Sequence, residues 1–139
     1  MSSSKSINIS VLVARIILGL IFFVFGLNFF LHFIPNNSQP EGKAAAFVGG
    51  LFQSGYIFPF IKIVETISGA LLLANRFVAL VLVVLMPISI NILLFHSILL
   101  PSGMTIVISF LIIISQLYLA WAYRDYYKQL FIAKPTPAV

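Results

Sequence analysis

The polar residues that could do chemistry are few, and two of them lie three residues apart in one apolar segment. Lys62 and Glu65 share a helix face at that spacing. Glu65 is near the middle of the segment, where a carboxyl group must be paired, hydrogen-bonded or protonated. Its candidate partners are Lys62 on the same helix, and Arg15 or Gln116 from other segments. The pattern predicts either an ion pair that fixes helix register or a carboxylate that carries a proton or binds a ligand.

Arg15 is another charged residue inside an apolar segment, about one turn from its start. At about 100° per residue, Gly19, Phe22, Gly26 and Phe33 fall on the same stripe as Arg15. Two glycines on one stripe let a neighbouring helix approach closely. The stripe therefore favours an arginine that faces the interior of a helix bundle. The alternative is a side chain that snorkels to the headgroups at the nearby membrane surface.

A second polar group is predicted in the opposite half of the membrane. Asn28 and His32 are spaced i,i+4 in the first apolar segment, and Asn91 and His96 occupy the corresponding half of the third. Pro87 removes a backbone donor four residues before Asn91 and predicts a kink, beside which a local polar pocket could form. The two histidines raise the question of a metal or haem. Metal-ligand spacing and an obvious third ligand are lacking, so no metal site is predicted and plain hydrogen bonding is the favoured interpretation.

The chain lacks the residue combinations that mark an autonomous enzyme. It has no nucleophile–base–orienter set, no phosphate-binding loop and no pair of catalytic carboxylates. It also has no cysteine, which excludes thiolate chemistry, disulfides and a cysteine-held iron–sulfur cluster. Any thiol chemistry would have to come from a partner or substrate, and the cofactors stay open, with a quinone or haem possible through a partner protein.

The composition assigns these residues to a membrane protein. Hydrophobic residues make up 61% of the 139-residue chain and charged residues only 8%, whereas a soluble domain has about 25% charged residues. The net charge of +5 does not indicate nucleic-acid binding, because the basic residues lie at the ends of apolar segments and form no basic stripe. We therefore expect one all-α membrane domain over residues 1–139, in contact with the lipid bilayer.

Four apolar segments are long enough to cross a hydrocarbon core of about 30 Å. They span approximately residues 11–34, 56–74, 77–100 and 105–123. Short loops force neighbouring helices to run antiparallel, which predicts a polytopic four-helix bundle with up-down-up-down topology. Residues 43–53 are too few and too glycine-rich to span, and predict a short helix on the extracytoplasmic membrane surface.

The distribution of basic residues predicts the orientation of the bundle. One side carries most of the Lys and Arg residues, whereas the opposite side has Lys43 accompanied by Glu41. The residues on the basic side are Lys5, Arg15, Arg76, Arg124, Lys128 and Lys134. Because basic residues accumulate on the cytoplasmic side of membrane helices, both termini are predicted to be cytoplasmic.

The order of these residues resembles the DoxX family of small four-helix membrane proteins. The first apolar segment reads ARIILGLIFFVFG at 14–26, and the second leads into the third through ETISGALLLANRFVAL at 65–80. The similarity extends over roughly residues 10–130. The chain departs from the family at Asn28, because many members have a basic residue shortly after the second glycine of the first helix.

The resemblance implies a four-helix bundle in a bacterial or archaeal plasma membrane. Named members of the family are associated with quinone-linked oxidation of sulfur compounds or with membrane oxidoreductase complexes, usually as a small partner subunit. The corresponding hypothesis is an accessory subunit of a quinone-linked membrane oxidoreductase complex. Two alternatives remain open: a structural or assembly protein without chemistry of its own, and a small solute or proton transporter subunit that acts as a homodimer.

Overall fold

The computed structural model describes residues 2–35 and 39–139, and it describes side chains from residue 8 onward. The side chain of Lys5, which the charge distribution assigned to the cytoplasmic side, therefore lies outside the described part. Within this part the chain is helical and contains no strand. The elements in chain order are α1 (Ser2–Leu31), α2 (Gly42–Gln53), α3 (Ile57–Leu73), α4 (Val78–Leu94), the π-helical turn η1 (Phe95–Leu99), α5 (Gly103–Ala122) and the 3-10 helix η2 (Arg124–Phe131).

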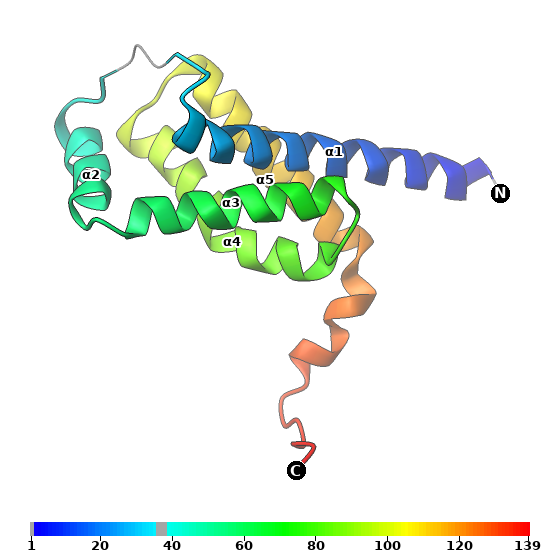
Figure 1. Cartoon of the computed structure of the whole chain (residues 1–139). Helices are drawn as coiled ribbons and strands as arrows, with labels where there is room; N and C mark the ends of the chain where they lie inside the picture. Colours follow the sequence, from blue (N-terminus) through cyan, green and yellow to red (C-terminus); the bar gives the residue numbers. More distant parts are fainter. Residues whose placement is uncertain (1, 36–38) are drawn as a thin grey trace.

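The long helices pack side by side, and the short helix α2 lies across one end of them (Figure 1). Helix α1 contacts α3 and α5, and α4 contacts the same two helices. The start of α1 and the end of α5 meet at the opposite end from α2, where the Ser10 and Tyr118 hydroxyls are 2.6 Å apart. This arrangement leaves α2 against the starts of α3 and η1.

The helices are those of a multi-pass membrane protein. Among the described residues, three helices are long and apolar enough to cross a membrane, at Asn8–Leu31, Val78–Leu99 and Gly103–Ala122. Helix α3 has 17 residues, and it joins α2 through a bend of 88°, so the pair can supply a fourth span. Ser54 stabilises this bend, because its Oγ donates to Leu51 O at 2.7 Å and accepts from Ile57 N at 3.1 Å.

Helix α1 ends at Leu31, earlier than the predicted boundary at residue 34. His32 has a positive φ of 53°, which takes the backbone out of the helix. The side chain of Asn28 accepts a hydrogen bond from the backbone N–H of Ile34 at 2.7 Å and so stabilises the departing chain. Phe33 is consequently exposed beyond the helix. Its predicted place on the Arg15 stripe was wrong, because the helical periodicity stops before it.

The other predicted segments differ from the observed helices by smaller amounts. Helix α1 begins at Ser2, before the predicted start of the first segment at residue 11. The predicted surface segment 43–53 is helical as α2. Helix α4 continues through Pro87, and the chain then widens into the π-helical turn that begins at Phe95, where Leu100 N donates to Phe95 O. The third predicted segment, 77–100, thus corresponds to α4 together with η1.

Three glycines form the contact between α1 and α3. A Cβ atom at Gly69 would collide with the backbone N of Phe23 and lie 2.8 Å from the backbone O of Gly19. A Cβ atom at Gly26 would collide with the side chain of Thr66. These glycines let the two backbones approach more closely than any other residue would allow. We call this contact the α1–α3 seam, defined by Gly19, Gly26 and Gly69.

Candidate functional site

The described residues that could act together line a cavity of about 340 Å³ between α2, α3, α4 and η1. Its polar lining consists of Lys62 and Glu65 from α3, Asn91 from α4 and His96 from η1. Pro87 lines the same cavity, one helical turn before Asn91, as the predicted pocket beside this proline requires. We call this cavity the α2–α4 pocket.

Lys62 is the partner of Glu65. The Lys62 Nζ atom lies 2.9 Å from Glu65 Oε2, in the i,i+3 arrangement that the sequence predicts. The Glu65 side chain is only 4% exposed and the Lys62 side chain is 19% exposed. The carboxyl group is therefore buried, whereas the lysine remains partly accessible. Lys62 Nζ also lies 5.5 Å from the centre of the Phe58 ring, a cation–π distance.

Arg15 is buried at the opposite end of α3 and does not pair with Glu65. Its Nη1 atom donates to the backbone oxygen of Leu72 at 2.6 Å and of Leu73 at 3.3 Å. These carbonyls belong to the last turn of α3, which carries the negative end of the helix dipole, and Leu72 O also accepts from Asn75 N at 3.2 Å. The side chain is 8% exposed, so it faces the interior and does not snorkel. Arg15 is a capping group for α3.

Gln116, the third candidate partner of Glu65, also bonds elsewhere. Its Nε2 atom donates to the backbone oxygen of Leu82 at 2.7 Å, and its Oε1 atom accepts from the hydroxyl of Ser89. Gln116 and Ser89 are fully buried and connect α5 to α4. Sequence reasoning missed Ser89, although a serine and a glutamine in two apolar segments are a recognisable sign of an interhelical hydrogen bond.

His96 presents one nitrogen to the protein interior. Its Nδ1 atom lies 3.0 Å from both the backbone oxygen of Ile92 and the hydroxyl of Ser109. Ser109 donates its own hydrogen to Thr105 O at 2.7 Å, so towards His96 it accepts. This pattern assigns the proton of a neutral ring to Nδ1 and leaves Nε2 as an acceptor.

The four residues predicted as one outer polar cluster are divided between two places. The residues that line the α2–α4 pocket include Asn91 and His96 but, within the described chain, neither Asn28 nor His32. The Asn28 side chain accepts the hydrogen bond from Ile34 N at the end of α1, and His32 is exposed beyond that end. The division follows from the early end of α1, which removes His32 from the helical face that Asn28 occupies.

Aromatic rings complete the wall of the pocket, and the sequence pattern did not identify them. Phe47 of α2 lies 5.7 Å from Phe95 of η1, centre to centre. Phe58 of α3 stacks on Phe52 at 4.5 Å. Phe47 and Leu51 are one turn apart on α2 and both line the pocket. This i,i+4 apolar spacing is the signal that could have identified α2 as a cover for α3 and α4.

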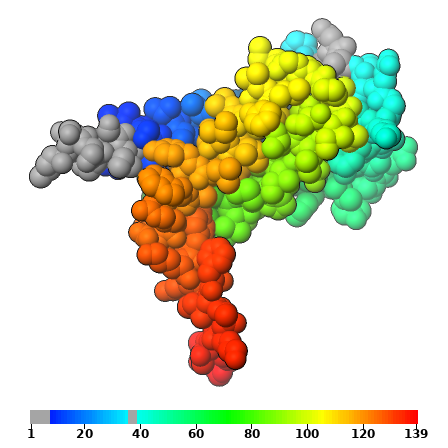
Figure 2. All heavy atoms as spheres, turned by 180° about the vertical axis from the view of Figure 1, so that it is seen from behind, coloured from blue at the N-terminus to red at the C-terminus, as the bar shows by residue number. Residues whose placement is uncertain are grey.

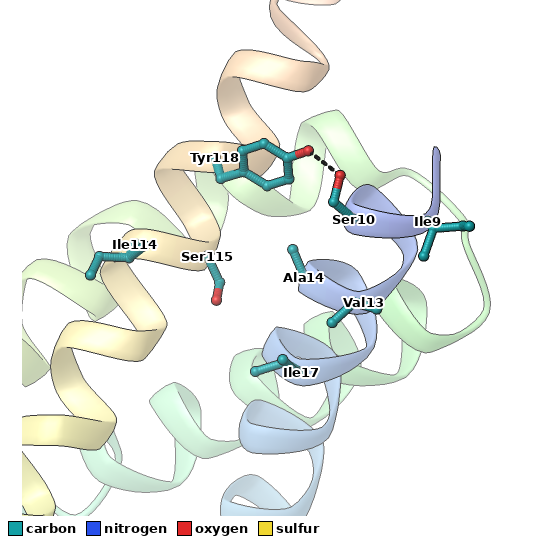
Figure 3. A pocket seen from close by; sticks show the side chains of 8 residues that line it. All are labelled: Ile9, Ser10, Val13, Ala14, Ile17, Ile114, Ser115 and Tyr118. Carbon is teal, nitrogen blue, oxygen red and sulfur yellow. Dashed lines mark hydrogen bonds between the residues drawn. The ribbon is translucent and has the colours of Figure 1, made fainter. Parts of the chain in front are cut away.

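A larger cavity of about 500 Å³ lies between α1 and α5 (Figure 3). Its walls are mainly aliphatic, and Ser10 and Tyr118 close one end through their hydroxyl contact. Ser115 contributes another hydroxyl, but none of the lining residues in the described chain carries a charge. The smaller α2–α4 pocket is therefore the candidate site, because it combines a cation, a carboxyl group, an amide and an imidazole.

Comparison of the chain with protein-family models, curated proteins and solved structures gives no match. The similarity to the DoxX family therefore stays a prediction from the residues. Among the described residues, no group of three His, Asp or Glu side chains is placed to hold a metal ion.

Proposed function

We propose that the chain is a small subunit of a membrane oxidoreductase complex and that its α2–α4 pocket binds the head group of a quinone. The observation that carries the proposal is the Lys62–Glu65 pair and His96 on the wall of one phenylalanine-lined cavity. The cavity volume of about 340 Å³ falls in the range of about 300–1,000 Å³ typical of small-molecule sites. The resemblance to the DoxX family supports the same assignment.

The groups in the pocket match the chemistry of a quinone. A quinone head is planar, so it packs against rings such as Phe58 and Phe95, and its carbonyl oxygens accept hydrogen bonds from a group such as the Lys62 ammonium. The reduced quinol has two hydroxyl groups, which donate to acceptors such as His96 Nε2 or the Glu65 carboxylate. The two electrons of the reduction come from a partner oxidoreductase, and the two protons enter through these polar side chains.

The proposed topology is an up-down-up-down bundle in a plasma membrane, with both termini in the cytoplasm. It is supported by the positive-inside tendency and by the exposed basic residues Arg76, which follows α3, and Arg124 and Lys128, which follow α5 in η2. Helix α3 is about 25 Å long at 1.5 Å per residue. A span this short is accommodated by local thinning of the bilayer, and α2 then lies along the outer surface.

Quinone binding to the purified protein tests the proposal. The protein is extracted in a mild detergent, its lipids are analysed for bound quinone, and short-chain benzoquinones and naphthoquinones are titrated by calorimetry. We expect micromolar binding that weakens about tenfold in Lys62→Gln and in His96→Gln. His32→Gln is the matched control, since it changes the other histidine outside the pocket. Equal affinities in all four proteins, or no binding of either quinone class, would contradict the proposal.

A second candidate is a small solute or proton transporter subunit acting as a homodimer. The irregular course of the third span favours it, because Pro87 and the π-helical turn Phe95–Leu99 both border the pocket, and π-helical turns are frequent at functional sites. Proton flux into liposomes that falls in Glu65→Gln would favour this candidate. Flux at the level of protein-free liposomes would eliminate it.

A structural or assembly role is the third candidate. It is favoured by the complete pairing of the interior, since every buried side-chain nitrogen and oxygen in the described residues has a hydrogen-bond partner. This role requires that replacing Arg15 and Glu65 together with apolar residues preserves both membrane insertion and the growth phenotype. Loss of the phenotype in a correctly inserted variant would exclude it.

A further inference from the structure

The chain after α5 combines exposed apolar residues with basic residues. We call residues 124–134 the C-terminal segment; it comprises η2 and the three residues that follow. Leu130 is 71% exposed and Phe131 is 83% exposed, and Tyr126 and Ile132 are also more than half exposed. Figures 1 and 2 show that the segment projects from the body of the molecule. Apolar surface of this kind on a segment with no cover of its own marks an interaction site.

The charges of the C-terminal segment are mainly positive. It contains Arg124, Lys128 and Lys134 against the single acidic residue Asp125. Lys128 Nζ lies 2.9 Å from Asp125 Oδ1, but both side chains are about three-quarters exposed, so this pair is weak and free to exchange for another anion. An anionic surface is therefore the complementary partner.

The segment starts directly after a candidate membrane span. Helix α5 is a candidate span that ends at Ala122. Trp121 stacks on Tyr118 at 6.1 Å, and the Arg124 guanidinium lies 4.7 Å from the centre of the Trp121 ring. Tyrosine and tryptophan rings beside a basic residue are typical of the headgroup layer.

A hydrogen bond holds the segment near this level. Tyr127 donates its hydroxyl to the backbone oxygen of Ala79 at 2.8 Å, which ties η2 to the first turn of α4. Beyond this tie the segment runs across the direction of α1, α3 and α4 (Figure 1). If these helices cross the bilayer, a chain that leaves them crosswise runs along the bilayer surface.

We propose that the C-terminal segment lies in the headgroup layer of the leaflet at which α5 ends, where it binds anionic lipid. Leu130, Phe131 and Ile132 enter the boundary between headgroups and acyl chains, as the apolar face of an interfacial helix does. Arg124, Lys128 and Lys134 contact lipid phosphates. The proposal does not depend on the function of the α2–α4 pocket.

A single label tests where the segment lies. The chain contains no cysteine, so Gln129→Cys places one fluorophore on η2 of the full-length protein. The labelled protein is reconstituted in nanodiscs of phosphatidylcholine alone or with one-third phosphatidylglycerol, and the fluorophore is quenched with the neutral reagent acrylamide. We expect the quenching constant to fall at least threefold in the anionic nanodiscs. A label at Ser102→Cys, in the exposed turn before α5, serves as the matched control and is expected to change little.

Two sets of substitutions separate the contributions of charge and apolar surface. Replacing Arg124, Lys128 and Lys134 with glutamine removes the lipid dependence of the quenching, because each basic residue near an anionic surface strengthens binding about fivefold. Replacing Leu130, Phe131 and Ile132 with serine raises quenching in both lipids. Equal quenching of the original protein in both nanodiscs would overturn the proposal. Protection that appears only when two protein copies share a nanodisc would also overturn it, because the partner would then be a second chain.

Discussion

The two ends of α3 contact their neighbours in opposite ways. Near its C-terminal end, α3 packs against α1 along the α1–α3 seam, where Gly69 leaves no room for a methyl group. Arg15 closes this end by binding the last carbonyls of α3. Near its N-terminal end, α3 borders a cavity that is large enough for a small molecule, and Lys62 and Glu65 lie on the cavity wall.

The buried charges at the two ends of α3 serve different purposes. Arg15 donates to two backbone carbonyls in the last turn of α3, so its charge joins α1 to α3 and completes the fold. Lys62 and Glu65 satisfy each other on a single helix and connect no second helix within the described chain. An ion pair that joins nothing yet borders a cavity is available for binding, whereas a buried arginine that joins two helices is not.

Substitution of Gly69 is expected to have the largest effect, because it breaks the tighter of the two contacts. A Cβ atom at Gly69 would overlap the backbone of α1, which side-chain movement does not relieve. We expect Gly69→Ala to lower the free energy of unfolding by about 3 kcal/mol, as measured by denaturation in mixed micelles. Gly50→Ala on α2 is the matched control, since a Cβ atom there meets nothing within 4 Å. Equal stability of the two variants would show that the seam is not tight.

Removal of the Arg15 side chain tests whether its charge serves the fold alone. Arg15→Met removes the guanidinium donor from the carbonyls of Leu72 and Leu73, and Leu72 O then keeps only its contact with Asn75 N. This loss is expected to cost about 1–3 kcal/mol in the same assay. Arg15→Lys keeps the charge but loses one of the two contacts, and is expected to fall between the original protein and Arg15→Met. Quinone affinity should be unchanged in folded Arg15→Lys. A tenfold loss of affinity there would contradict the separation of the two regions.

The Lys62–Glu65 pair is expected to matter less for stability than Arg15. Lys62→Met leaves the carboxyl group without its cation and should cost about 1–2 kcal/mol, below the value for a fully enclosed pair because Lys62 is 19% exposed. The double variant Lys62→Met/Glu65→Leu should recover most of this loss, because no unpaired charge remains. A double-mutant cycle measures the coupling. Additive losses would show that the two side chains act independently.

The sequence predicts the ion pair better than the position of Arg15, for a physical reason. Residues three apart on a helix are neighbours by geometry alone, so the Lys62–Glu65 contact needs no tertiary information. The acceptors of Arg15 are backbone oxygens, which every residue has and no residue type marks. Hydropathy locates the helices for a similar reason, because hydropathy, like the spacing of Lys62 and Glu65, is a local property of the sequence.

The pocket depends on a turn that hydropathy does not report. Helix α2 covers α3 and α4 because the chain bends by 88° between Gln53 and Ile57. The bend uses Ser54 hydrogen bonds and a positive φ of 79° at Gly55, and a Ser-Gly pair indicates a turn without giving its direction. Asn28 and His32 were grouped with the pocket residues on depth alone, whereas the end of α1 moves His32 away.

The smallest expected effect concerns Tyr127, which extends the tightly packed end of the molecule into η2. Tyr127→Phe removes the hydrogen bond to Ala79 O and is expected to cost about 0.5–1 kcal/mol.

Burial, and secondarily the neighbouring Tyr123, raises the pKa of the Tyr127 phenol above the usual value of about 10. The folded protein therefore holds this proton more tightly than the unfolded chain does. The contribution of Tyr127 is complete below about pH 10 and is lost as the pH rises through the folded-state pKa. Thermal unfolding of both proteins at pH 8 and pH 10.5 should show the difference between them shrinking at the higher pH. A constant difference would mean that the phenol does not donate to α4 and that the tightly packed region ends with α5.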